Sequence, residues 1–216
     1  MMGNDLCAKK IAYFWIQYYT LDKIMIPKLN ESGVLPPFFP ESAPTIRADV
    51  APYLVSLTEL VQNYATTNTR KRILIGYLEY RKSLKKIGIN TGFQWIDGSF
   101  TEDVEQVRKR GPSDIDLLTF AFRPDPSFMN VDLWGKFIED HKQLFYPKDT
   151  KENFLCDAYY IDLNMHPVYL VKNISYWHGL FSHQKETFLW KGMLEIDLAE
   201  SEDGLEDLLS LEAECD

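Results

Sequence analysis

Residues 93–99 read Phe93-Gln94-Trp95-Ile96-Asp97-Gly98-Ser99, and residues 113–117 read Ser113-Asp114-Ile115-Asp116-Leu117. The first stretch predicts a strand that ends in a Gly-Ser turn, and the second predicts a strand that carries two acids. Side chains of a strand alternate between its two faces, so Asp114 and Asp116 should point the same way while Ile115 and Leu117 point into the core. Such an arrangement is suited to presenting a triphosphate and a divalent metal together.

The residue types in these two stretches support that interpretation. Two carboxylates one strand repeat apart can share Mg²⁺, which takes oxygen ligands and keeps waters and substrate phosphates in its shell. Gly98 allows backbone amides to approach a phosphate closely, and the Ser99 hydroxyl adds a donor. The alternative is a surface turn followed by an edge strand whose acids face water, but this leaves the apolar character of the second strand unexplained.

The two stretches, separated by a spacer of fourteen residues (100–113), resemble the signature of the nucleotidyltransferase superfamily. That superfamily includes polymerase beta, kanamycin nucleotidyltransferase and the minimal nucleotidyltransferases. With further stretches at residues 26–37, 176–181 and 190–196, residues 25–198 look similar to an uncharacterised, mostly bacterial family of stand-alone nucleotidyltransferase-like proteins. The resemblance implies the fold and a metal site, and it implies no substrate.

The superfamily also places a third carboxylate on a neighbouring strand. By resemblance, Asp157 is the better match, although a polar residue on a half-exposed strand is the alternative. Asp162 has the opposite parity, so it should face the other side of the sheet and is more simply a strand-end acid beside a turn. Asp114, Asp116 and Asp157 would then hold two Mg²⁺ or Mn²⁺ ions about 3.5–4 Å apart. Asp157 would also accept the proton of the attacking hydroxyl.

Positive side chains near these acids are candidates for binding the nucleotide. Arg108 and Lys109, followed by Arg110, lie in the spacer, so they are expected on a loop near the metal site. There they could hold the triphosphate, the pyrophosphate or an RNA backbone, or they could simply balance nearby acids on an exposed loop. Lys191 could reach the phosphates from the last strand, or it could protect an edge strand from aggregation.

Length and composition fit one compact domain. With 216 residues, 45% of them hydrophobic, the chain can bury a sizeable core. The pattern predicts an α/β (α+β) fold with a small mixed β-sheet of about four to five strands flanked by helices. The expected strands are 93–98, 114–122, 154–163 and 187–197, and the expected helices are 52–64, 69–87, 131–146 and 169–181.

The two ends differ from this central domain, which is expected over residues 25–199. Residues 1–24 contain an apolar run, 11–21, that is shorter than the about 20 residues a spanning helix needs. They are interpreted as a packed segment or as a non-native extension before a start at Met25. Residues 200–216 carry eight acids and no lysine or arginine, out of a net charge of −9. This acidic C-terminal tail is expected to be solvated, to dock a protein partner or to mask the site.

The remaining composition narrows the functional classes. Three widely spaced cysteines without a CxxC pair indicate a reducing, cytoplasmic location and no zinc site, and no membrane partner is expected. One class is an enzyme that transfers a nucleoside monophosphate from an NTP to a hydroxyl of a protein, RNA or small molecule. The others are an antitoxin-like or phage-defence component acting on or through a protein, and a nucleotide-binding pseudoenzyme. The helix expected at 69–87 keeps RNA open as an acceptor.

Overall fold

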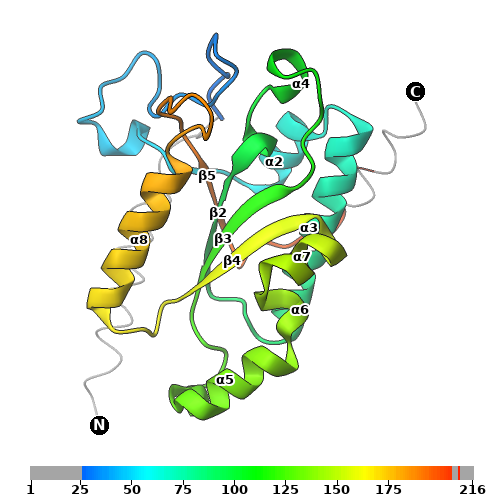
Figure 1. The fold of residues 1–216 in the computed structure, drawn as a ribbon, viewed down its shortest axis with the longest axis vertical. Coiled ribbons are helices and arrows are strands. Elements are labelled where there is room, and N and C mark those ends of the chain that lie inside the picture. Colours follow the sequence, from blue (N-terminus) through cyan, green and yellow to red (C-terminus); the bar gives the residue numbers. More distant parts are fainter. Residues whose placement is uncertain (1–25, 206–208, 210–216) are drawn as a thin grey trace.

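The structure, a computed structural model, describes residues 26–205 and Leu209, so the interpretations of residues 1–24 lie outside the described residues. The expected α/β class is confirmed. Five strands form one mixed sheet in the order β1-β5-β2-β3-β4, with helices on both faces (Figure 1). Across the described residues, no helix has both the length and the apolar character needed to cross a membrane.

The sheet combines parallel and antiparallel pairs. Its strands are β1 (Tyr53–Leu54), β2 (Gly92–Asp97), β3 (Ile115–Ala121), β4 (Cys156–Asp162) and β5 (Leu194–Asp197). Strand β2 runs antiparallel to both β3 and β5, whereas β3 pairs with β4 and β1 pairs with β5 in parallel. Three strands were predicted to within about two residues. The expected strand 187–197 is wrong in its first seven positions, and β1 was not predicted.

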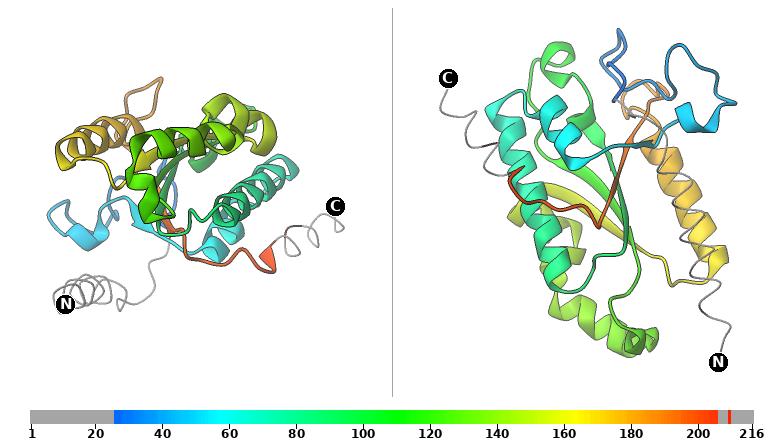
Figure 2. Two further views of the ribbon diagram at one scale, coloured as in Figure 1. Left: turned by 90° about the horizontal axis from the view of Figure 1, so that it is seen from below. Right: turned by 180° about the vertical axis from the view of Figure 1, so that it is seen from behind.

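The helices lie in two layers around this sheet. They are α2 (Leu57–Tyr64), α3 (Asn68–Lys86), α4 (Val104–Val107), α5 (Val131–Asp140), α6 (Lys142–Phe145), α7 (Pro147–Phe154) and α8 (Pro167–Phe181). Helix α8 covers one face of the sheet, and α3, α6 and α7 lie on the other (Figure 1; Figure 2). Short 3₁₀ turns lie at Arg47–Asp49, Gly98–Thr101 and Pro126–Met129.

A capping box explains why the first long helix begins later than the predicted 52–64. The Ser56 hydroxyl accepts a hydrogen bond from the Glu59 amide at 3.1 Å, and the Glu59 carboxylate accepts one from the Ser56 amide at 2.9 Å. Such reciprocal bonds satisfy two amides that a helix start leaves without partners. Helix α2 therefore starts at Leu57, which leaves Tyr53–Leu54 extended as β1.

Helix α7 was not predicted: residues 147–153 lie between the helix expected at 131–146 and the strand expected at 154–163. The single helix expected at 131–146 is two helices in the structure, because α5 ends at Asp140 and the short α6 follows it. Helix α7 then opens with Pro147, whose missing amide costs least in a first turn, and it ends at Leu155 in the left-handed region with φ of 55°. Strand β4 consequently starts at Cys156 rather than at 154.

Each face of the sheet has its own core. The larger core joins the α3 side of the strands to α2, α3, α6 and α7, and includes Leu74, Tyr77 and Leu117. The smaller core, under α8, includes Trp95 and Phe120. Strand β3 contributes to both cores, which is why its sequence is apolar at nearly every position.

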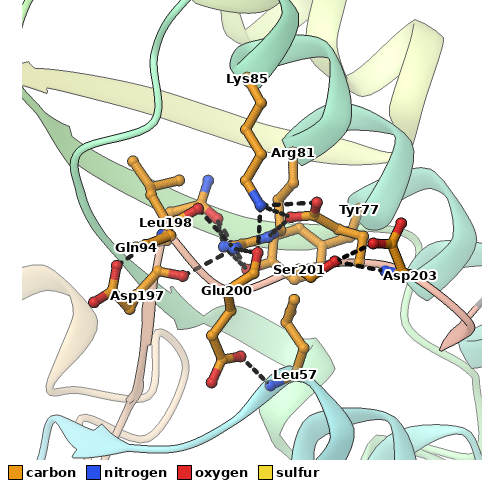
Figure 3. A network of polar contacts seen from close by, with 12 residues as sticks. Leu57, Tyr77, Arg81, Lys85, Gln94, Asp197, Leu198, Glu200, Ser201 and Asp203 are labelled. Atoms are coloured by element: carbon orange, nitrogen blue, oxygen red, sulfur yellow. Dashed lines mark hydrogen bonds and ion pairs between the residues drawn. The ribbon is translucent and has the colours of Figure 1, made fainter.

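A buried arginine joins α3 to the chain beyond β5. The Arg81 side chain is fully buried, and its guanidinium donates to Gln94 Oε1 and to the Asp197 carbonyl, both at 2.8 Å (Figure 3). Its Nε also lies 2.8 Å from Glu202 Oε1, a carboxylate shared with Lys85. The acidic segment therefore begins inside the domain.

This packing corrects two expectations. A solvated tail from residue 200 is wrong for its first residues, because Glu202 is only 4% exposed and both Leu205 and Leu209 are buried. The helix expected at 69–87, which kept RNA open as an acceptor because of its basic residues, also offers fewer of those residues to solvent than its sequence indicates. Arg70 and Arg81 on α3 are buried in ion pairs with acids, so they are committed to the protein itself.

Candidate active site

Three aspartates lie side by side on the neighbouring strands β2, β3 and β4. Asp97 at the end of β2 is the register partner of Asp116 on β3, and Asp116 is the register partner of Asp157 on β4. Directly paired residues of neighbouring strands project to the same face, so all three carboxylates lie on the α8 side. The predicted Asp116 and Asp157 therefore come together, and Asp97 joins them.

A fourth carboxylate and a lysine complete this cluster. Asp114 directly precedes β3, is 6% exposed and lines one cavity with Asp116. Ile115 and Leu117 are buried in the larger core, so the predicted alternation is confirmed. Lys151 of α7 makes an ion pair with Asp114, and its ammonium lies 3.8 Å from Asp157 Oδ2. The side chain of Lys151 is 51% exposed, so this ammonium can leave the acids without disturbing the core.

Gly98 is required by the position of Asp116. Its φ of 78° lies in the left-handed region, and a Cβ placed on it would come within 1.6 Å of Asp116 Oδ2. The Gly-Ser turn therefore packs its backbone directly against a carboxylate, and Ser99 lines a cavity together with Asp116. Burial, reinforced by the charges of Asp114 and Asp157, raises the pKa of Asp116 to about 6. A cation in the cluster would relieve this repulsion.

Lys191 is held in a buried polar cluster rather than exposed on an edge strand. It precedes β5, is 2% exposed, and places its ammonium 3.0 Å from Asp97 Oδ1 and 2.9 Å from Glu102 Oε1. Burial raises the pKa of Asp97, although the Lys191 ammonium opposes this effect. The alternative interpretation, in which Lys191 protects an edge strand from aggregation, is wrong, because β5 lies between β1 and β2. The positive charge of Lys191 is balanced by Asp97 and Glu102.

The acids open into a cavity of about 760 Å³. Arg108 and Arg110 line it, as the position of the spacer predicts, whereas Lys109 does not line it. Arg108 is itself paired with Glu102 at 3.1 Å and with the exposed Glu186 at 3.6 Å. The cavity thus has acids along the sheet and arginines along the spacer, which is the charge pattern that a metal-bound phosphate chain requires.

The donor set fits a hard divalent cation, although the carboxylates are not yet arranged around one. Within residues 26–205 and Leu209, no three His, Cys, Asp or Glu side chains already surround a common point as metal ligands would. Asp114 is turned towards Lys151 instead. However, buried Asp114 Oδ2 accepts no hydrogen bond of good geometry from the described residues; it has only the ammonium at ion-pair distance. Carboxylate oxygens of Asp114, Asp116 and Asp157 are the ligands that Mg²⁺ and Mn²⁺ take.

Comparisons with known proteins place the chain in a family. Residues 27–197 match a family of unknown function (DUF6932). The chain belongs to this family. The matched residues end at the last residue of β5 and contain every acid of the cluster, so the family region includes the candidate site. Neither the search of curated proteins nor the search of solved structures finds a match.

The site also contains residues that the sequence did not single out, and it leaves out one alternative. Asp162 faces the other side of the sheet, where Arg123 Nη2 lies 2.6 Å from it, so it stays outside the cluster as its parity predicted. Asp97 could have been found, since it directly precedes Gly98 in a predicted strand. Lys151 could not have been found from the sequence, because its contact with Asp114 depends on how α7 packs.

Proposed function

We propose that the protein is a metal-dependent nucleotidyltransferase that moves a nucleoside monophosphate from an NTP to a hydroxyl of a protein, RNA or small molecule. The observation that supports this most strongly is the register of three strands, which lines up Asp97, Asp116 and Asp157 beside the Gly98–Ser99 turn. Acids that only faced water on an edge strand would not be expected to pair in register across three strands. Two like-charged carboxylates in direct register oppose each other unless something positive is shared between them.

The proposed metal site uses the three acids that the cavity brings together. Asp114, Asp116 and Asp157 would hold Mg²⁺ or Mn²⁺, which supplies charge neutralisation on the phosphates and activation of the acceptor hydroxyl. The side chain of Asp157 is 26% exposed, compared with 8% for Asp114. It is therefore accessible to an incoming acceptor and can take the proton of its hydroxyl.

The reaction itself needs little from the protein beyond position and charge. The acceptor oxygen forms a bond to the α-phosphorus, the bond from that phosphorus to the bridging oxygen breaks, and pyrophosphate leaves. Gly98 and Ser99 would lie along the phosphates, with Arg108 and Arg110 facing them across the cavity. Lys191 is assigned a positioning role, because its ammonium holds Asp97 and Glu102 in place.

Transfer of label tests this proposal. The purified protein is incubated with each α-³²P-labelled NTP and Mn²⁺ or Mg²⁺, first alone and then with a cell lysate treated with either nuclease or protease. We expect label on a macromolecule or small acceptor with the wild type, and none with Asp116→Ala. Asp162→Asn is the matched control, since it removes an acid on the opposite face. Nucleotide binding without transfer under any condition would overturn the enzymatic proposal and favour a nucleotide-binding pseudoenzyme.

A further inference from the structure

Phe188 stands out as a side chain that the fold does not use. It is 79% exposed and lies on the segment between α8 and β5, at the rim of the acid-lined cavity. Its φ of 58° lies in the left-handed region, which a bulky residue adopts only at a cost. A large apolar side chain that is both exposed and held in a strained backbone points to a ligand contact.

Hydrogen bonds hold this segment in one shape. The Gln184 amide donates to the Leu189 carbonyl and the Phe188 amide donates to the Gln184 carbonyl, both at 2.9 Å. An isolated antiparallel bridge between His183 and Trp190 closes the turn. Phe188 is therefore presented on a compact turn rather than on a loose loop.

The same turn is tied to the acid cluster through buried side chains. Gln184 is 4% exposed, and its Nε2 donates to Glu102 Oε2 at 2.8 Å. Glu102 in turn binds Lys191, which lies 3.0 Å from Asp97 Oδ1. In Figure 1 the segment after α8 (orange) lies at the same end of the sheet as α4, where β2 ends. The position of Phe188 is thus fixed relative to the proposed metal site.

We propose that Phe188 is the stacking platform for the nucleobase of the bound NTP, an inference that rests on the proposed function. The cavity offers carboxylates for the metal-bound phosphates, and Arg108 and Arg110 for their remaining charge. Leu180 and Phe188 supply its apolar rim, where the uncharged part of a nucleotide would lie. Stacking on an aromatic ring uses the π-face that every base has, so it does not select one base.

Paired ligands that differ only in the nucleoside test this platform. Binding of ATP and of inorganic tripolyphosphate, each with Mn²⁺, is measured by calorimetry for wild type, Phe188→Ala and Phe188→Trp. Leu189→Ala is the matched control, because it removes a neighbouring exposed side chain that does not line the cavity. We expect Phe188→Ala to weaken ATP binding by roughly 5- to 150-fold, the range for loss of one base–aromatic stack, and to leave tripolyphosphate binding unchanged. Phe188→Trp and Leu189→Ala should bind both ligands as the wild type does.

The outcomes separate the two proposals. If wild type binds neither ligand with Mn²⁺, the proposed function fails and the platform fails with it. If wild type binds both equally well, or Phe188→Ala keeps the wild-type preference for ATP, only the platform is overturned. Equal weakening of both ligands in Phe188→Ala would also overturn it, because the ring would then support the turn rather than a base. The melting temperature of Phe188→Ala should match that of wild type, since the ring is largely exposed.

Discussion

Glu202→Ala should destabilise the protein strongly, although the residue lies in a segment that resembles a disposable acidic tail. The Glu202 carboxylate is 4% exposed and lies 2.8 Å from both Arg81 Nε and Lys85 Nζ. Arg81 is completely buried between α3 and the chain that follows β5 (Figure 3). Removing the carboxylate leaves the arginine charge in the interior with only neutral acceptors.

The size of the effect follows from these contacts. Removing one partner of a buried ion pair costs about 3–5 kcal/mol. The lower end applies here, because the Arg81 guanidinium keeps Gln94 Oε1 and the Asp197 carbonyl, each at 2.8 Å. Lys85 is 23% exposed, so it can turn to water and adds little. We therefore expect a loss of about 3 kcal/mol, or roughly 6–12 °C in melting temperature for a chain of this size.

Urea unfolding followed by circular dichroism measures this loss. Asp203→Ala is the control, since it removes the same charge at the neighbouring position. The Asp203 side chain is exposed and accepts a hydrogen bond from the Ser201 hydroxyl. Glu202→Gln keeps an oxygen for Arg81 and should lose less than the alanine variant, which keeps the test informative if that variant does not fold. A free energy of unfolding for Glu202→Ala within about 0.5 kcal/mol of the Asp203→Ala control would refute the reasoning.

Three further predictions concern the acid cluster. Asp157→Asn should lower the transfer rate by about 10²-fold or more with little change in NTP affinity, whereas Asp162→Asn should keep the wild-type rate. Single-turnover kinetics measure both rates. An inactive Asp162 variant together with an active Asp157 variant would contradict the assignment. Lys151→Gln should tighten Mn²⁺ binding by about two- to fivefold in a titration, because it removes a half-exposed competing cation; weaker binding would show that the lysine supports the site. Asp116→Asn should raise the melting temperature at pH 7.5 but not at pH 4. Burial and neighbouring charges raise the pKa of Asp116 to about 6, so the folded wild type loses stability as pH rises from about 4 through 6.

Local pattern predicted much of the site. The alternation of acids and apolar residues at 114–117 correctly separated the cavity side chains from the core. Parity also distinguished Asp157 from Asp162, and the structure places them on opposite faces. These predictions succeed because the period of a strand depends only on neighbouring residues, and β3 and β4 are long enough to show it.

Contacts between distant segments could not be predicted in this way. Lys151 reaches Asp114 only because α7 packs beside β4, and the sequence of α7 has no strong apolar face. Arg81 looks like a solvated helix residue until Glu202, more than a hundred positions later, is placed beside it. Lys191 likewise becomes buried only when β5 enters the sheet between β1 and β2. In each case the partner is selected by tertiary packing, which overrides local polarity.

The central position of β5 also determines when the sheet can be completed during synthesis. Strand β5 is encoded last of the five, yet it fills the gap between β1 and β2. On the ribosome, β2 therefore waits with an open edge while about a hundred further residues are translated. An open edge invites pairing with other chains, so nascent copies need shielding until Leu194 emerges. A message truncated before that codon would leave β1 without its neighbour in the sheet and would leave β2 as an open edge of the remaining strands.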